Sequence, residues 1–118
     1  MRVLVCGGRQ FTDVAMLNGV LSKWASDADV VIHGAATGAD TAAGKWAKLV
    51  GKRVEEYPAD WKKYKKSAGP IRNSQMLDDG KPDLVIAFPG GRGTADMVQK
   101  AKMAGIPVME IDNNGACR

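Results

Sequence analysis

The sequence is poor in the residues that bind metal ions or form disulfides. It contains one histidine, His33, and two cysteines, Cys6 and Cys117, which lie near opposite ends of the 118-residue chain. A structural metal site needs several such ligands close together, and a disulfide framework needs several cysteines in pairs. We therefore expect neither a metal site nor a disulfide framework.

Long apolar segments are also absent. No apolar run approaches the roughly 18 residues of a membrane-spanning helix, and the start MRVLVCGGRQF has only four apolar residues before its two glycines. A secretory signal peptide has an apolar segment of about 7–15 residues. We therefore expect a cytoplasmic protein that does not associate with membranes.

The remaining composition is that of an ordinary globular domain, with 45% hydrophobic and 25% charged residues, and the length fits a single domain. The net charge of +4 has a local source. Of the 17 basic residues, four are Lys62, Lys63, Lys65 and Lys66, and the other 13 balance the 13 acidic residues. A protein that binds a long nucleic-acid duplex usually spreads its positive charge more widely.

Short apolar runs alternate with segments of helical periodicity. The apolar runs are residues 3–6, 30–32, 54–57, 84–88 and 108–111. Helical spacing follows the first, second and fourth runs, and a further helix is predicted from Pro70 to about Asp79. Apolar runs without polar alternation are typical of strands buried on both faces. We predict one α/β domain over residues 1–112, a doubly wound five-stranded parallel sheet with helices on both faces, followed by a loose tail over residues 113–118.

Glycines follow three of the predicted strands. They are Gly7, Gly8, Gly34, Gly38, Gly90, Gly91 and Gly93. In an open parallel sheet, ligands bind outside the carboxyl ends of the strands, where the strand order reverses. Glycine loops that lead into helices present backbone N–H groups to an anion. We expect a phosphate site at this edge; the alternative is that these glycines only form tight turns.

Two familiar nucleotide-binding motifs are missing. Neither G-x-G-x-x-G nor G-x-x-x-x-G-K-[ST] occurs in the sequence. We therefore expect neither a nicotinamide-dependent dehydrogenase nor an NTP-hydrolysing motor, and we expect no resident cofactor.

The combined motifs resemble a known family. They are CGGR, HGAATGAD, YPADWKKY, GPIRN and PGGRGT, in that order along about residues 1–111. This pattern resembles the YspA/YpsA-related branch of the SLOG superfamily, which also contains the Lonely Guy phosphoribohydrolases and the DNA-processing protein DprA. The resemblance implies a Rossmann-like sheet in the strand order 3-2-1-4-5, a nucleotide or nucleotide-derived ligand and, from the Lonely Guy relatives, a homodimer.

The resemblance also assigns roles to residues, with one departure. In the Lonely Guy enzymes the PGGxGT loop holds the 5′-phosphate, and a glutamate three residues after its threonine acts with an arginine in cleaving the N-glycosidic bond. Here the position three residues after Thr94 is Met97. The nearest acid, Asp96, is one residue away, which rotates a side chain by about 100° on a helix. Arg72, in GPIRN, matches the arginine.

The two candidate catalytic residues are Asp40 and Arg72. Cleavage of an N-glycosidic bond needs a carboxylate that stabilises an oxocarbenium-like state or activates water. Asp40 is suited to this role, or to capping the helix that follows it. The expected ligand-binding residues are Gly7, Gly8, Arg9, Gly34, Thr37, Gly38, Asn73, Gly90, Gly91, Gly93 and Thr94.

Three of these polar side chains have an expected contact and an alternative. We expect Arg9 and Arg72 to pair with phosphate and Asn73 to contact a ribose hydroxyl or a base edge. The alternative for each is a side chain that faces solvent. His33 either acts as an acid or base or is bonded to the backbone at the end of its strand.

The aromatic residues fall into two groups. Trp61 and Tyr64 alternate with lysines in WKKYKK, which indicates either a mobile flap that stacks on a base or a short segment packed on the domain. Trp24 and Trp46 lie on apolar helix stripes, and Cys6 lies in a strand; we expect these three side chains in the core.

These patterns favour a protein that binds a nucleotide or a nucleotide-derived small molecule. One alternative is an N-glycosidic hydrolase that acts on a nucleoside 5′-monophosphate or an ADP-ribose-type ligand. A second alternative is single-stranded DNA binding through WKKYKK, by analogy with DprA.

Overall fold

The apolar runs of the sequence form a parallel sheet. The computed structural model describes residues 1–117. The strands are β1 (Arg2–Cys6), β2 (Val30–His33), β3 (Arg53–Glu56), β4 (Leu84–Ala87) and β5 (Val108–Glu110). They lie in the order β3-β2-β1-β4-β5, and neighbouring strands are parallel. The predicted Rossmann-like sheet and its strand order are confirmed.

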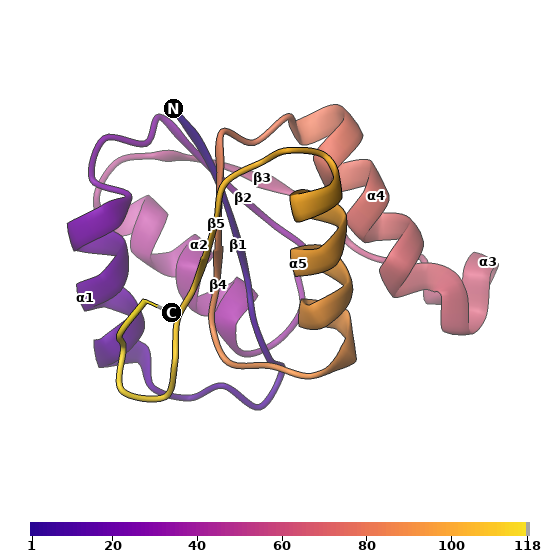
Figure 1. Ribbon diagram of the computed structural model, residues 1–118, viewed down its shortest axis with the longest axis horizontal. Coiled ribbons are helices and arrows are strands. Elements are labelled where there is room, and N and C mark those ends of the chain that lie inside the picture. The colour runs from indigo at the N-terminus through magenta and orange to yellow at the C-terminus, as the bar shows by residue number, and fades with distance from the viewer. Residues whose placement is uncertain (118) are drawn as a thin grey trace.

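Helices cover both faces of this sheet (Figure 1). α1 (Val14–Trp24) and α2 (Ala39–Leu49) lie on one face, and α4 (Ala68–Gly80) and α5 (Arg92–Met103) lie on the other. A short helix, α3 (Trp61–Tyr64), and a 3-10 turn, η1 (Lys65–Ser67), precede α4. Within residues 1–117, no helix has the length and apolar character needed to cross a bilayer.

Alternate residues of the central strand pack into two separate cores. Val3 and Val5 pack with α1 and α2, whereas Leu4 and Cys6 pack with α4 and α5. Because both faces of the strand are buried, its sequence is continuously apolar. Cys6 is 7% exposed and Trp46 is 5% exposed, so both are core residues, as expected.

Trp24 corrects an expectation, because it does not lie in the core. It is the last residue of α1 and is 44% exposed, with the ammonium of Lys23 5.1 Å from its ring centroid. Leu21 and Ala25 are four residues apart and both fully buried. They continue the buried stripe of α1, so the side chain of Trp24 projects beside that stripe.

Residues 111–117 form a turn that lies against α1. The N–H of Asp112 donates to the carbonyl of Ala116 (2.9 Å), and Ile111 pairs with Cys117 in an antiparallel bridge. A Cβ on Gly115 would lie 2.9 Å from Cγ of Met16. These contacts place residues 112–117 beside α1, and residue 118 lies outside the described residues. The domain boundary at residue 112 and the loose tail over residues 113–118 stay predictions.

Candidate functional site

Three loops meet at the carboxyl edge of the sheet, and Gly8 lies at their centre. The N–H of Gly8 donates to the carbonyl of Pro89 (2.9 Å), and the carbonyl of Gly8 accepts from the N–H of Ala39 (3.2 Å). A Cβ on Gly8 would lie 3.0 Å from the carbonyl oxygen of Pro89 and 3.1 Å from Cα of Gly90. A side chain at this position would therefore push the β1–α1 loop and the β4–α5 loop apart, and glycine allows their close approach.

Two further glycines allow the loops to pack together. Gly38 has a φ of +78°, and a Cβ there would overlap the carbonyl oxygen of Gly8. A Cβ on Gly90 would overlap Oγ1 of Thr94. These glycines serve the contacts between loops.

The start of α5 is open. Gly91 precedes the helix, no side chain caps it, and nothing lies within 4 Å of where a Cβ of Gly91 or Gly93 would be. Within residues 1–117, the N–H groups of Arg92, Gly93 and Thr94 have no acceptor. Unpaired N–H groups at the start of a helix suit an anion.

The loop between β2 and α2 differs from the expected phosphate loop. The N–H groups of Gly34 and Ala36 both donate to Oδ2 of Asp40, at 3.1 and 3.3 Å, and the N–H of Ala35 donates to Nδ1 of His33 (3.0 Å). The side chains of the protein itself satisfy these three donors. His33 is therefore bonded to the backbone, which was one of its two expected roles.

Asp40 does not cap its helix, because the N-cap residue of α2 is Gly38. This corrects the alternative role considered for Asp40. Its side chain is buried, with an exposed fraction of 6%. Burial raises the pKa of this carboxyl to about 6, although the N–H groups of Ala36 and Gly34 and the charge of Arg72 act in the opposite direction.

Arg72, from α4, joins the ends of two strands. Its Nη1 donates to the carbonyl of Gly34, after β2, and to the carbonyl of Tyr57, after β3, at 3.5 Å. Its Nε donates to Oδ1 of Asn73 (3.1 Å). Burial lowers the pKa of this guanidinium. Arg72 is therefore half-buried and held by the backbone, in contrast to the solvent-exposed alternative.

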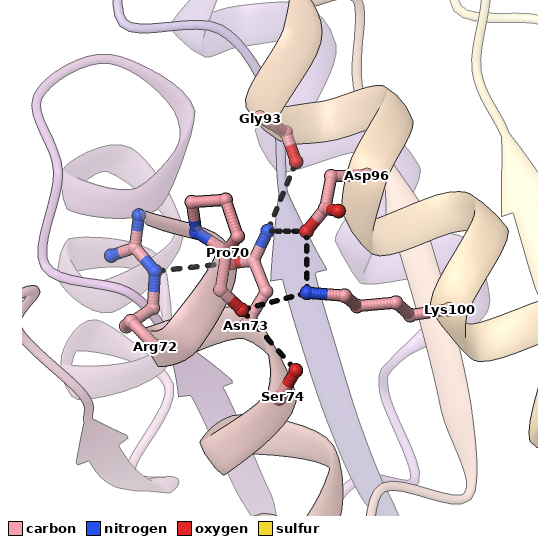
Figure 2. Close-up of polar contacts among 7 residues, drawn as sticks. All are labelled: Pro70, Arg72, Asn73, Ser74, Gly93, Asp96 and Lys100. Carbon is pink, nitrogen blue, oxygen red and sulfur yellow. Dashed lines mark hydrogen bonds and ion pairs between the residues drawn. The ribbon is translucent and has the colours of Figure 1, made fainter. Parts of the chain in front are cut away.

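Asn73 ties α4 to the start of α5 (Figure 2). Its side chain is 4% exposed, and its Nδ2 donates to the carbonyl of Gly93 (3.1 Å) and to Oδ2 of Asp96 (3.0 Å). The ammonium of Lys100 lies 3.0 Å from the same carboxylate oxygen and donates to the carbonyl of Pro70 (2.7 Å). The amide of Asn73 is thus engaged within the protein, in contrast to the solvent-facing alternative.

Asp96 lies beside the site, which the sequence analysis did not predict. Asp96 lines the cavity described below, while its neighbour Met97 is fully buried in the core against β1 and β4. The residue that takes the place of the Lonely Guy glutamate, Met97, therefore packs in the core of this chain. The spacing of Asp96 and Lys100, four residues apart on a helix, was the available signal for their ion pair.

A cavity of about 580 Å³ lies between the loops, α3, α4 and the start of α5; we call it the α4-side cavity. Ten predicted site residues line it: Gly7, Gly8, Arg9, Asp40, Trp61, Arg72, Asn73, Gly91, Gly93 and Thr94. Lys66, Arg92 and Asp96 add three charged side chains to its wall. Burial raises the pKa of the Cys6 thiol at this wall, so the thiol stays protonated.

Five predicted site residues lie outside the α4-side cavity. Gly34 and Thr37 line a neighbouring cavity of about 300 Å³, and Oγ1 of Thr37 donates to the carbonyl of Arg9 (3.5 Å). Gly38 and Gly90 shape the loops, as described above. Tyr64 is 38% exposed and lines none of these cavities.

Trp61 is the aromatic residue at the cavity. It begins α3, whose first turn is capped by Asp60 through a bond from the N–H of Lys63 (3.1 Å). The indole is 47% exposed, and the guanidinium of Arg9 lies 5.0 Å from its ring centroid. The exposed ring and the adjacent cation form one wall of the cavity.

Comparison with known proteins identifies similar sequences. The profile of the YspA, cpYpsA-related SLOG family matches residues 1–64. The Gene 61 protein of Mycobacterium phage D29 is 38% identical over 120 residues, which cover 93% of this chain and 95% of that protein.

Solved structures share the fold at low sequence identity. The X-ray structure of TM1055 superposes with a TM-score of 0.71 at 18% identity, over 91% of this chain and 71% of that chain. UDP-GlcNAc 2-epimerase from Neisseria meningitidis, solved with UDP-GlcNAc, gives 0.59 at 19% identity, over 94% of this chain and 32% of the epimerase. MurG from Acinetobacter baumannii also gives 0.59, at 15% identity, over 94% and 34% of the two chains.

Proposed function

The chain belongs to the YspA, cpYpsA-related SLOG family, and on this premise we propose that it binds a nucleotide or a nucleotide-derived small molecule at the carboxyl edge of its sheet. The observation that carries the proposal is the open start of α5 beside the α4-side cavity. A phosphate group there accepts from the N–H groups of residues 92–94 and lies at the positive end of the helix dipole.

The rest of the ligand occupies the α4-side cavity. Arg9 and Arg72 line this cavity and supply charge opposite to that of a phosphate. The exposed indole of Trp61 offers a flat surface on which a base stacks. A volume of about 580 Å³ is within the range of small-ligand sites.

A thermal-shift panel tests the proposal. The panel contains AMP, GMP, the other 5′-monophosphates, ADP-ribose and NAD, with a short single-stranded DNA for comparison. A ligand that binds only the folded protein stabilises it by about 2.7 kcal/mol at 100 times its Kd. We expect a saturable rise in the unfolding midpoint with a nucleotide. No shift with any of the nucleotides contradicts the proposal.

One substitution tests the position of the phosphate. Gly91→Asp places a carboxylate at the start of α5, where it repels a phosphate and competes for the same N–H groups. We expect at least about a tenfold loss of nucleotide affinity by calorimetry. Gly19→Asp is the matched control, because Gly19 is also open, with nothing within 4 Å of its Cβ position, but lies within α1. Equal affinities of both variants contradict this position.

A second candidate function is hydrolysis of the N-glycosidic bond, and the environment of Asp40 favours it. Asp40 lines the cavity with a pKa of about 6, so a fraction of it carries a proton near neutral pH. In this reaction water adds to C1′ of the sugar, the bond from C1′ to the base breaks, and the base leaves with a proton. The free base appears in a chromatogram after incubation with wild type and is absent with Asp40→Asn.

Two parts of the proposal rest on the family resemblance and the sequence. We propose a homodimer, as in the Lonely Guy relatives, and a cytoplasmic location. Sedimentation of the purified protein tests the first: a single species with the mass of one 12.6-kDa chain contradicts it.

A further inference from the structure

A second cavity lies across the ridge formed by Gly8 and Gly91. It has a volume of about 520 Å³ and lies between the β1–α1 loop, the start of α1, the β4–α5 loop and Asn113; we call it the α1-side cavity. It shares four lining residues with the α4-side cavity: Gly8, Arg9, Gln10 and Gly91. The two cavities therefore adjoin at these residues, over the carboxyl ends of β1 and β4.

The two cavities lie toward opposite faces of the sheet. The α1-side cavity is bounded by α1, and the α4-side cavity by α4 and α5, which cover the other face (Figure 1). The open start of α5 lies where they meet. A molecule with a phosphate at that point extends into both cavities if it has a group on each side of the phosphate.

The α1-side cavity has apolar walls and polar groups that can recognise a ring edge. Phe11, Met16 and Pro89 supply an aromatic ring, a thioether and a pyrrolidine. The side-chain amides of Gln10 and Asn113 make no hydrogen bond to residues 1–117, so both can donate and accept. Flat heterocycles have this combination of apolar faces and polar edges.

The charge of this cavity favours a neutral occupant over a second anionic group. Arg9 is the only cation among its lining residues, and it already stacks on Trp61 in the other cavity. Asp13 is the only acid, and its carboxylate accepts from the N–H of Met16 (3.1 Å). By contrast, four cations line the α4-side cavity: Arg9, Lys66, Arg72 and Arg92.

We propose that the α1-side cavity is a second subsite that binds a neutral heteroaromatic ring. The ligand is then a nucleotide whose phosphate carries a further ring-bearing group, as in a dinucleoside diphosphate, because a terminal monophosphate leaves this cavity empty. The inference rests on the proposed function, since the phosphate over Gly91 joins the two halves.

Matched pairs of ligands test the second subsite. The probes are the four ribonucleoside 5′-monophosphates and the four symmetric P1,P2-dinucleoside diphosphates with the same bases. Members of a pair carry nearly the same charge at pH 7.5, about two negative charges, and differ in the second nucleoside. We expect the diphosphate of at least one pair to bind wild type at least about tenfold more tightly by calorimetry, as stacking of one more base predicts.

Two substitutions block the α1-side cavity. Asn113 and Thr12 are exposed and line this cavity from two different loops, so Asn113→Trp and Thr12→Trp each fill part of it. We expect either variant to reduce the advantage of the diphosphate to less than about threefold while the Kd of the monophosphate stays unchanged. Asn114→Trp is the matched control, because Asn114 is exposed in the same turn and lines neither cavity.

A measurement on wild type needs no blocking variant. The ¹³C-labelled methyl group of Met16, assigned with Met16→Leu, reports on the α1-side cavity. We expect the diphosphate to shift its NMR signal and the monophosphate to leave it in place.

The outcomes separate this inference from the proposed function. If the monophosphate binds and the diphosphate binds no more tightly, the second subsite is wrong and the proposed function stands. If the advantage of the diphosphate survives in both blocking variants, or the methyl signal does not move, the second ring lies elsewhere. If neither class binds, the proposed function and the second subsite are both wrong.

Discussion

At the scale of the residue, Asp40 is a buried carboxylate held by two backbone donors. Both N–H groups, from Gly34 and Ala36, reach the same oxygen, Oδ2. Among residues 1–117 no Lys or Arg forms an ion pair with it. Burial is therefore the main cause of its raised pKa, and ionisation of Asp40 destabilises the folded protein.

Asp40→Asn tests this effect on stability. The pKa is about 6 in the folded protein, against an ordinary value of 3.8, so the folded protein holds the proton more tightly than the unfolded chain does. The stability contributed by this group is complete below pH 4 and is lost as the pH rises to about 6. We expect wild type to lose about 3 kcal/mol of unfolding free energy over this interval. Asp40→Asn should not lose it, because one amide oxygen can accept both N–H groups.

Urea unfolding of both proteins at pH 4 and pH 8 measures the difference. Burial lowers the pKa of His33, but His33 is present in both proteins, so its effect cancels in the comparison. A difference in unfolding free energy that is the same at both pH values contradicts the assignment.

Gly38 and Gly51 share a positive φ but differ in the expected cost of substitution. Both have a φ of +78°, but a Cβ on Gly38 would overlap the carbonyl of Gly8, whereas nothing lies within 4 Å of a Cβ on Gly51. We expect Gly51→Ala to lower the unfolding free energy by about 1 kcal/mol, the cost of a left-handed alanine. We expect Gly38→Ala to cost at least about 2 kcal/mol more. Equal costs in urea unfolding contradict the packing of these loops.

At the scale of the element, Asn73 joins α4 to the first turn of α5. Asn73→Ala removes its two bonds to α5, from Nδ2 to the carbonyl of Gly93 and to Oδ2 of Asp96, and also the bond that its Oδ1 accepts from Nε of Arg72. We expect a loss of about 2 kcal/mol in unfolding free energy, together with faster amide hydrogen exchange in the first turn of α5. Ser74→Ala is the control, since the hydroxyl of Ser74 is exposed and bonds only to Pro70 in its own helix. Equal effects of the two substitutions contradict a link between the helices.

The strands and long helices were predictable from the sequence. The apolar runs are continuous because both faces of the sheet are covered, and Gly51 and Gly105 mark helix ends with a positive φ. α4 begins at Ala68, two residues before the expected Pro70, because the 3-10 turn leads directly into it. Ser67 precedes this helix without a side-chain cap bond, so the boundary lacks the capping contact that would have marked it.

The site was less predictable than the fold. The pattern HGAATGAD indicated an open anion loop, but Asp40 folds back onto the amides of its own loop. The N–H groups of this loop could bind either a ligand or the carboxylate of Asp40. Which acceptor they bind depends on the backbone conformation of the loop, and the residue types alone do not determine that conformation. The spacing of Asp96 from Thr94 argued against a role for Asp96 in the site. The rotation of about 100° between successive helical residues, however, buries Met97 and places Asp96 at the cavity.

At the scale of the whole molecule, the positive charge of the lysine cluster is divided. Lys66 lines the α4-side cavity, whereas Lys62, Lys63 and Lys65 line neither this cavity nor the one around Thr37. We expect Lys66→Ala to weaken mononucleotide binding by about threefold to tenfold and Lys62→Ala to leave it unchanged at physiological salt. Calorimetry of the two variants checks this; equal losses would indicate a diffuse effect of net charge.

The same lysines distinguish the nucleic-acid alternative. Binding of single-stranded DNA through WKKYKK depends on all four lysines and falls steeply with salt. If the proposed mononucleotide site is correct, we expect oligo-dT of twelve residues to compete weakly with the nucleotide. A strong salt-dependent affinity for the oligonucleotide that is lost in Lys62→Ala would instead favour the alternative.

The contacts of Gly8 have a consequence for how such a protein can change during evolution. Gly8, Gly38 and Gly90 are fixed by their neighbours, because any side chain there meets backbone or Thr94. Gly91 and Gly93 border open space, so the fold itself tolerates side chains at these positions. Substitutions at Gly91 and Gly93 can therefore change which ligand is preferred, while Gly8, Gly38 and Gly90 keep the packing of the three loops unchanged. Within the PGGRGT loop, Gly90 is therefore restricted to glycine by its neighbours, whereas Gly91 and Gly93 can be replaced without disturbing the fold.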